Sequence, residues 1–343
     1  MTCKTRMTII QPPITYIYSL FFIVGGVIAI IANAIVLRIL WFREYRNSRS
    51  NRILTSLAMS DFLVGLVVFP LTSFQILNHA SLNNCDIDFT RSYFSLLLQG
   101  SSCLSLAVIS YDRYILMTKI QIYHRRYVKR TIIVLVFLAW FIPAVTPFLR
   151  FVGSLPYLGV TLAIYIIPYV VLGTSYFLIT NALRNQEALL KKHYIDSMNI
   201  EAGKVNGAVE VTSATEQPRE APHINEELKI HKKISTTKNQ QNKGKSHIKL
   251  AKQVTILLLA YFFCVTSLLI WLILEFANIL NPFLSPFTLQ NIYLFAMVTI
   301  SWNSCINPII YYAKNPDIRR GFRKLFKIRR SKEDGSTTNS KTL

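Results

Sequence analysis

An aspartate and an arginine stand side by side at the end of a long apolar run, in the stretch Ile109-Ser-Tyr-Asp112-Arg113-Tyr114-Ile115. A strongly basic segment that begins at Lys119 follows it. An acid and a base at such a boundary can form a charge pair that switches between two arrangements. The simpler interpretation is an arginine that reaches from the end of the run to lipid phosphates. Polar residues elsewhere in the chain favour the first interpretation.

Several of these polar residues lie inside apolar runs. Asp61 ends the stretch Leu57-Ala-Met-Ser-Asp61. Asn303, Asn307 and Tyr311 are spaced four residues apart, so they share one helical face. A buried carboxylate must be paired, protonated or bound to a cation. Asp61 is therefore predicted either to bind an ion or to be a neutral acid within a hydrogen-bond network.

The apolar residues of the 343-residue chain are gathered in long runs. Of all residues, 52% are hydrophobic and 16% are charged, which is too little charge for the surface of a soluble domain. A helix needs about 20 apolar residues to cross a bilayer. The runs long enough to do so are Ile14–Leu40, Ile53–Leu77, Tyr93–Met117, Thr131–Phe151, Leu158–Leu183, Val254–Phe276 and Phe287–Ala313. Because hydrocarbon offers backbone groups no partner, the predicted fold class is an all-α membrane protein, a seven-transmembrane helix bundle.

Lysine and arginine lie mostly on one side of these spans. The loops after spans 1 and 3 and the tail after span 7 are basic. The opposite side carries little beyond Lys4, Arg6, Arg91 and Arg150. The positive-inside rule predicts a multi-pass plasma-membrane protein with its amino terminus outside and its carboxyl terminus in the cytoplasm, in contact with the lipid bilayer. Nucleic acid is not an expected partner, because the net charge of +21 is divided among membrane-flanking loops.

The chain divides into three parts. Residues 1–14 form a short extracellular amino terminus, residues 15–313 the bundle, and residues 314–343 an amphipathic helix and cytoplasmic tail. Within the bundle, the polar residues of about 185–246 predict a largely disordered cytoplasmic loop whose ends extend the helices of spans 5 and 6.

The tail begins with an amphipathic pattern. Its apolar residues share one helical face, with cations on the other, and they are Ile318, Phe322, Leu325 and Phe326. This pattern predicts a short eighth helix on the membrane surface. The alternative is a solvated basic tail.

Six motifs occur in the spans and in the order that are typical of one known family. They are Asn33, Leu57-Ala-x-x-Asp61, Asp112-Arg113-Tyr114, Trp140, Pro168 and Asn307-Pro308-x-x-Tyr311. Through them, essentially the whole chain resembles the rhodopsin-like (class A) G-protein-coupled receptors, and spans 2, 3 and 7 are nearest to receptors for amines and related small molecules. The resemblance implies a receptor that binds an extracellular ligand and activates a heterotrimeric G protein. The long cytoplasmic loop and the stretch Ser336-Thr-Thr-Asn-Ser340 would serve receptor kinases and arrestin.

The resemblance also implies an ion site in the middle of the bundle. In this family the aspartate of span 2 holds an allosteric sodium ion with serine and asparagine partners. The matching residues are Asp61, Ser102, Asn303 and Asn307. No other cofactor is implied.

For G-protein coupling, the resemblance implies that Asp112 pairs with the adjacent Arg113 while the receptor is inactive. On activation Arg113 turns to the G protein. The residues implied in coupling are Asp112, Arg113, Tyr114, Tyr176, Asn307, Pro308 and Tyr311. His247 stands where helix 6 often carries an acid that reinforces the resting state, so a raised basal activity is expected.

Span 6 departs from the family pattern. It reads Tyr261-Phe-Phe-Cys264-Val265-Thr266-Ser267, without the tryptophan beneath the ligand and without the proline that kinks the helix. A helix without proline keeps the hydrogen bond whose loss would bend it, and Thr266 and Ser267 bend a helix only weakly. The usual coupling of ligand to span 6 is therefore altered.

The cysteines depart as well. The loop after span 4 contains none, so the disulfide usual in the family cannot form. Cys103, Cys264 and Cys305 lie within spans and are expected to be buried packing residues. Cys3 and Cys85 lie outside the spans, where they either pair or remain free thiols.

The ligand site lacks the charge that an amine needs. Ser95 stands eighteen residues before Arg113, where amine receptors carry an aspartate, and serine cannot neutralise an ammonium ion unless Glu275 substitutes. The predicted lining is Ser95, Gln99, Val160, Thr161, Leu268, Leu269, Tyr293, Met297 and Ser301. It suits a small neutral or lipid-like ligand. The alternative is that these residues only pack against each other.

Other function classes fit less well. No phosphate-binding loop, metal-ligand cluster or nucleophile arrangement indicates an enzyme. Ser301 stands where a retinal protein needs a lysine, and no repeats indicate a transporter. The remaining alternative is a seven-helix receptor that does not couple and acts as a scaffold, heteromer partner or decoy.

Overall fold

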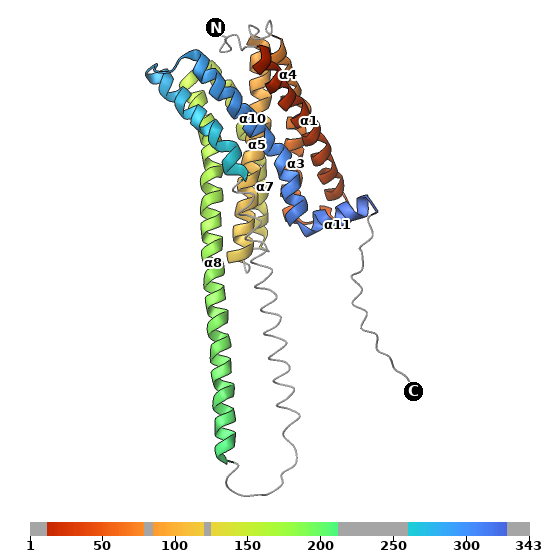
Figure 1. Ribbon diagram of the computed structural model, residues 1–343, viewed down its shortest axis with the longest axis vertical. Helices are drawn as coiled ribbons and strands as arrows, with labels where there is room; N and C mark the ends of the chain where they lie inside the picture. The colour runs from red at the N-terminus through yellow and green to blue at the C-terminus, as the bar shows by residue number, and fades with distance from the viewer. Residues whose placement is uncertain (1–11, 79–84, 120–124, 212–259, 328–343) are drawn as a thin grey trace.

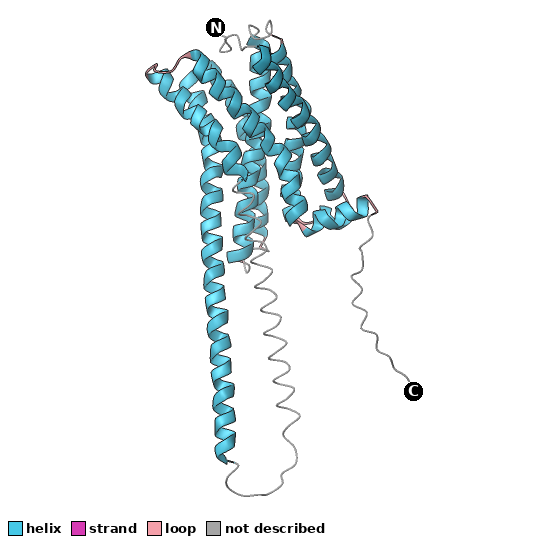
Figure 2. Cartoon of the chain, viewed as in Figure 1, coloured by secondary structure: helices cyan, strands magenta, loops and turns pink. Residues whose placement is uncertain are grey.

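The computed structural model describes residues 12–78, 85–119, 125–211 and 260–327. The regular elements within these residues are helices (Figure 2), and seven helical spans are long and apolar enough to cross a membrane. They are Ile14–Leu40, Arg49–Leu77, Asp86–Thr118, Val128–Phe151, Ser154–Ala182, Ala260–Leu280 and Pro286–Ala313. The predicted seven-span, all-α class is confirmed. The predictions for Cys3 and its pairing with Cys85, for His247 and for the Ser336–Ser340 tail lie outside the described residues.

The spans pack side by side as a helix bundle (Figure 1). The first half consists of α1 (Pro12–Leu40), the short α2 (Arg43–Arg46), α3 (Arg49–Leu63), a π turn η1 (Val64–Val68), α4 (Phe69–Leu77) and α5 (Cys85–Thr118). The second half consists of α7 (Arg126–Val145), a 3-10 turn η3 (Thr146–Phe151), α8 (Ser154–Val211), the sixth span, α10 (Pro286–Lys314) and α11 (Pro316–Leu325). We call the end of the bundle at which α11 lies the α11 end, and the end at which α1 begins the amino-terminal end.

The second span is interrupted by the π turn at Val64–Val68. Pro70 follows within the first turn of α4. Proline has no N–H, and its ring clashes with the carbonyl four residues before it in a regular helix. A wider π turn before the ring relieves this clash and lets the span continue.

The fifth span continues far beyond the bundle at the α11 end (Figure 1). α8 is helical from Ala182, where the span ends, to Val211, which is roughly 44 Å of helix. The predicted disorder was thus wrong for residues 185–211, because that stretch has no proline and follows a helix already nucleated by the span. The rest of the predicted loop lies outside the described residues.

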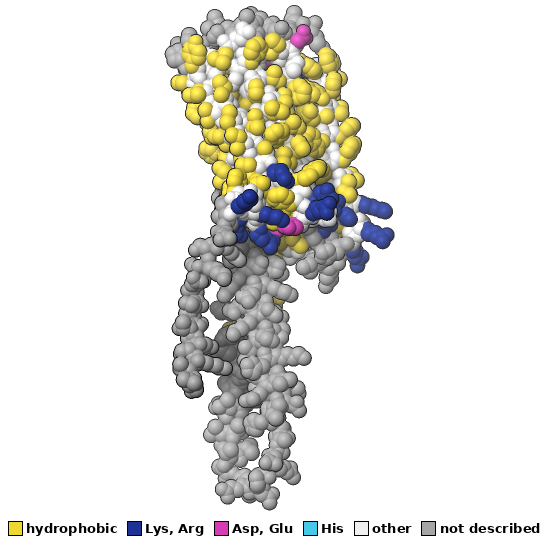
Figure 3. Space-filling model, turned by 90° about the vertical axis from the view of Figure 1, so that its right-hand side faces the viewer, with side chains coloured by type: hydrophobic (Ala, Val, Ile, Leu, Met, Phe, Trp, Pro, Cys, Tyr) yellow, Lys and Arg dark blue, Asp and Glu magenta, His cyan; other side chains and the backbone are white. Residues whose placement is uncertain are grey.

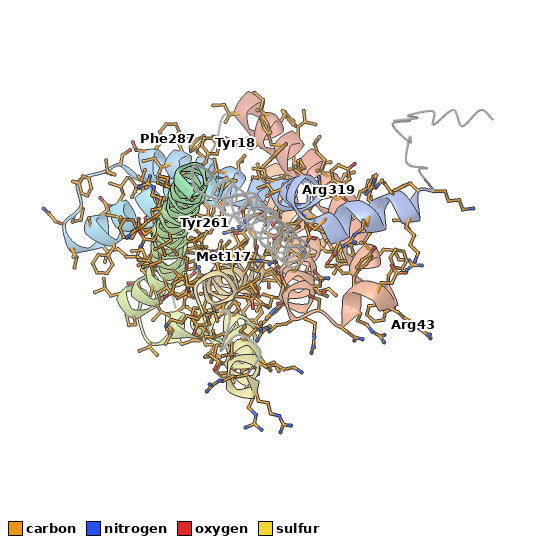
Figure 4. The ribbon with its side chains drawn as sticks, turned by 90° about the horizontal axis from the view of Figure 1, so that it is seen from below. Tyr18, Arg43, Met117, Tyr261, Phe287 and Arg319 are labelled. Carbon is orange, nitrogen blue, oxygen red and sulfur yellow. The ribbon has the colours of Figure 1, made fainter. Side chains whose placement is uncertain are left out.

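α11 confirms the predicted amphipathic helix. Ile318 and Gly321 are buried, and a Cβ on Gly321 would collide with the Ile39 side chain of α1. Glycine is thus required by the close approach of the two helices. On the other face, Arg319 points away from the bundle (Figure 4).

An ion pair joins α11 to α2. Lys324 Nζ donates to Glu44 Oε1 at 2.6 Å. This hydrogen bond and the opposite charge lower the pKa of Glu44 and raise the pKa of Lys324 from their ordinary values. Both side chains are more than half exposed, so water screens the pair and it contributes little to stability.

The outer surface matches a membrane setting. Apolar side chains cover the face of the bundle that Figure 3 shows, and lysine and arginine gather near the α11 end of that face. Inside, polar side chains join spans: Asn33 donates to the Ser304 carbonyl oxygen at 3.0 Å, and Trp140 donates to Ser56 Oγ at 2.8 Å. The first bond ties α1 to α10, and the second ties α7 to α3.

Candidate functional site

A buried carboxylate lies where three spans meet. Asp61 of α3 is fully buried and accepts three hydrogen bonds, from Ser102 Oγ at 2.7 Å, Ser304 Oγ at 2.8 Å and Asn307 Nδ2 at 2.8 Å. Ser102 belongs to α5 and the other two donors to α10. The partners described for Asp61 are all neutral, so no cationic side chain among them balances a negative charge. A carboxylate in this setting can bind a small cation together with its neutral partners, or it can be protonated.

The sequence named part of this cluster. Ser102 and Asn307 contact Asp61 as expected, whereas Asn303 is buried without a described bond to it. Ser304 was not predicted to contact Asp61. The signal was present, since residues three and four apart on a helix are neighbours and Ser304 lies three before Asn307.

The Asp-Arg pair lies at the α11 end but its two members are not bound to each other. Asp112 is buried and forms an ion pair with Arg49, at 3.5 Å between Nε and Oδ1. Arg113 instead donates to Ser50 Oγ. Both partners come from the first turn of α3. The expected local ion pair between Asp112 and Arg113 is thus replaced by two contacts across the helix interface.

The other residues implied in coupling surround the same end. Tyr311 is buried, and its hydroxyl has no hydrogen-bond partner among the described residues. Pro308 lies inside α10, and Tyr114 and Tyr176 are partly buried against apolar clusters. Figure 4 looks onto this end, with Met117 and Tyr261 toward the middle of the bundle. The tyrosines are thus held by packing, and the Tyr311 hydroxyl remains available to a new partner.

A cavity lies at the amino-terminal end. Its empty volume is about 490 Å³, including the part open to solvent. The lining residues are Arg91, Ser92, Ser95, Leu96, Arg150, Tyr157, Leu158, Thr161, Tyr165, Leu268, Trp271, Leu272 and Tyr293. They come from α5, η3, α8, α10 and the sixth span.

The cavity lining and the predicted pocket overlap in part. Ser95, Thr161, Leu268 and Tyr293 line the cavity. The predicted residues that do not are Gln99, Val160, Leu269, Glu275, Met297 and Ser301. Gln99 and Ser301 instead bond to each other at 2.8 Å across the α5–α10 interface, so they close the core rather than meet a ligand.

Two arginines that the sequence indicates only as charges on the outer side of the membrane line this cavity. Arg91 is 3% exposed and donates to Tyr293 at 2.6 Å and to Asp88 at 3.0 Å. Arg150 donates to Tyr157 at 3.2 Å and stacks on its ring. Arg91 lies four residues before Ser95, on the same helical face, which is the signal that could have placed it.

The motifs thus lie within seven spans. The Asp61 cluster lies between the α11 end, with Asp112 and Arg113, and the amino-terminal end, with the cavity. The family model of the "7 transmembrane receptor (rhodopsin family)" matches residues 32–157 and 153–311. The chain belongs to this family. The predicted class A membership is confirmed, and the chain is a multi-pass membrane receptor rather than an enzyme.

Receptors named for amines are among the proteins similar to this receptor. Trace amine-associated receptor 8c of Rattus norvegicus is 24% identical over 344 residues, which cover 96% of this chain and 91% of that protein. Trace amine-associated receptor 7h of the same species is 27% identical over 325 residues, 92% and 83% of the two chains. Octopamine receptor beta-1R of Drosophila melanogaster is 24% identical over 335 residues, 89% and 61% of the two chains. The likeness to amine receptors predicted from spans 2, 3 and 7 is confirmed.

The sixth span, which departs from the family pattern in sequence, forms polar contacts at Thr266 and Ser267. The Thr266 hydroxyl donates a hydrogen bond to the Phe262 carbonyl oxygen, and the Ser267 hydroxyl donates one to the Cys264 carbonyl oxygen. Ser267 also forms a hydrogen bond with Thr299 of α10. Among the described cysteines, Cys103, Cys264 and Cys305 are buried and free, as expected.

Replacing Ser304 with alanine should destabilise the receptor more than replacing Asn303. Ser304→Ala leaves a buried carboxylate one donor short, which costs about 1–3 kcal/mol. Thermal unfolding of the two purified variants measures the difference, with Asn303→Ala as the matched control. A larger loss for Asn303→Ala would show that the predicted residue, and not Ser304, supports Asp61.

Proposed function

We propose that this receptor takes up an extracellular ligand in the cavity at the amino-terminal end and activates a heterotrimeric G protein at the α11 end. The single observation that carries this proposal is the state of Arg113. It belongs to an intact Asp-Arg-Tyr motif, lies at the α11 end, and is held by the neutral hydroxyl of Ser50 rather than by a carboxylate. A cation held so weakly can turn to a partner at little cost.

The direction of signalling is supported by charge. Lysine and arginine gather near the α11 end (Figure 3), which is typical of the cytoplasmic side. The amino terminus would then lie outside, in the plasma membrane. Receptor kinases and arrestin remain proposed partners on the resemblance alone.

The pair of Asp112 and Arg49 supports a high basal activity. In the resting state that the family resemblance implies, Asp112 would restrain Arg113. Here Asp112 is instead paired with Arg49. The side chain of Arg49 is 15% exposed and that of Asp112 is 1% exposed. Arg49 thus competes with Arg113 for the same carboxylate, and the equilibrium moves toward the state in which Arg113 is free for a G protein.

A sodium ion at Asp61 is proposed as an allosteric ligand. Asp61 and Ser102, with Asn303 and Asn307 from the sequence and Ser304 from the structure, would hold it. The set fits because Asp61 is fully buried among neutral partners only, and hydroxyl and amide oxygens suit a hard cation. When bound, the ion would supply the missing positive charge.

A receptor that does not couple is the second candidate. It is favoured by the sixth span, which has Val265 and Ser267 in place of the family's tryptophan and proline. The bond between Ser267 and Thr299 also ties this span to α10. Such a protein would serve as a scaffold, heteromer partner or decoy.

Basal nucleotide exchange on a panel of G proteins tests the proposed function. Wild type should stimulate exchange on at least one G protein, and Arg113→Ala should abolish it at equal surface expression. Arg43→Ala is the control, because Arg43 is an exposed arginine at the same end that points outward (Figure 4). Exchange that is absent in wild type with and without ligand, or that persists in Arg113→Ala, would favour the second candidate.

Removing Arg49 should lower basal exchange. Arg49→Gln removes the competing cation from Asp112 and so favours a pair with Arg113, and a pair worth about 1 kcal/mol shifts a two-state equilibrium about fivefold. The same exchange assay measures the change, with Arg52→Gln as the neighbouring control. Unchanged or raised exchange in Arg49→Gln would contradict competition for Asp112.

Sodium should stabilise the receptor through Asp61. The midpoint of thermal unfolding of the wild type should be higher in sodium chloride than in potassium chloride at equal ionic strength, and Asp61→Asn should lose the difference. Because unfolding is measured without a G protein, the result does not depend on coupling. Equal midpoints for the wild type would support the alternative of a neutral aspartic acid.

A further inference from the structure

The charged residues among the described lining of the cavity are two arginines. Arg91 enters from α5 and Arg150 from η3. Asp88 lies beside the lining and pairs with Arg91 at 3.0 Å and, more loosely, with Arg150 at 3.9 Å. Glu275, the acid proposed from sequence to receive an amine, is not in the lining. Two guanidinium groups thus share one carboxylate, and the described lining with Asp88 carries a net positive charge.

The cavity also contains donors that are not satisfied. Arg91 Nε and Ser95 Oγ are buried without a hydrogen-bond partner among the described residues. Arg91 is 3% and Ser95 7% exposed, and both line the cavity one helical turn apart. Buried polar atoms in native proteins almost always have partners, so these two indicate an acceptor supplied by a ligand or water.

An ammonium group does not suit these surroundings. It would meet two arginines, and Ser95 offers it no charge. A neutral ligand, as predicted from the sequence, would leave the excess positive charge uncompensated in a partly dry site. A carboxylate supplies both the charge and acceptors that match the planar fork of arginine.

The rest of the cavity is apolar. Leu268, Trp271 and Leu272 of the sixth span line it, and the ring of Trp271 lies 4.7 Å from that of Tyr293. A short aryl or alkyl body fits this wall better than a polar one.

We infer that the receptor's ligand is a small organic carboxylate, held by Arg91 and Arg150 with its apolar body against the sixth span. This inference rests on the proposed function and names the ligand class of the same site. It separates this receptor from the relatives named for amines.

The same contacts give a route from the ligand to the sixth span. Tyr293 accepts a hydrogen bond from Arg91 at 2.6 Å and contacts Trp271. A carboxylate on Arg91 competes with the Tyr293 hydroxyl for the guanidinium, and so acts on the ring that touches the sixth span. This route uses neither the tryptophan nor the proline that the span lacks.

Matched ligand series test the inference. Phenylalkanoates, phenylalkanols and phenylalkylamines of the same chain lengths share one body and differ in the head group. Each series is titrated into purified full-length receptor in lipid nanodiscs, and binding is read as a rise in the unfolding midpoint. The best acid should bind at least about tenfold more tightly than its alcohol or amine counterpart, as expected for hydrogen bonds to charged groups.

Variants connect the preference to the arginines. Arg150→Gln should lower acid affinity about tenfold and leave alcohol affinity unchanged. Ser95→Asp adds a carboxylate one turn from Arg91, so it should reverse the preference toward the amine. To test Arg91 itself, lysine is a better replacement than glutamine, because lysine keeps the buried positive charge that pairs with Asp88. Arg43→Gln, at the α11 end, is the control and should behave as wild type.

Two readouts separate this inference from the proposed function. An acid series that binds no better than the other two, whether all bind or none does, overturns the inference, as does an acid preference that survives both Arg150→Gln and Ser95→Asp. G-protein exchange is measured on the same preparation. Acid binding without exchange retains the carboxylate site and rejects coupling, whereas exchange without acid preference retains coupling and rejects the site.

Discussion

Hydrocarbon offers no water to a buried polar group, and the receptor is organised around this constraint. Asp61 satisfies it with donors from α5 and α10, and thereby joins three spans at one point. Asn33 and Trp140 follow the same rule on the outer spans. Residue types that would perform catalysis in a soluble cleft here form hydrogen bonds between helices.

The two ends of the bundle use charge differently. At the α11 end, the contacts of Asp112 and Arg113 reach across to α3, and basic residues surround them. At the amino-terminal end, Arg91 is buried and donates hydrogen bonds to a tyrosine and a carboxylate. Exchangeable pairs suit a surface that must open to a protein, whereas a buried cation suits the selection of a ligand by charge.

Much of the fold could be predicted because hydrocarbon permits few alternatives to a helix. Composition and run length alone located the seven spans, and the family resemblance placed Ser102 and Asn307 near Asp61. Ser304 was missed because two adjacent polar residues compete for one position and only packing decides between them. Arg91 and Arg150 were missed because they were counted only as charges on the outer side of the membrane, and sequence does not show which side chains fold inward. The continuation of α8 was missed because polarity was interpreted as disorder.

The π turn at Val64–Val68 has a consequence for the register of the second span. It accommodates one residue more than a regular helix, and each residue turns a helix by about 100°. The buried side chains beyond it, Thr72, Ser73, Gln75 and Ile76, are thus turned by about 100° from where an uninterrupted regular helix would place them. A relative with a regular second span would correspond to this receptor across a one-residue gap there, and an ungapped alignment would misplace the face of α4 by about 100°.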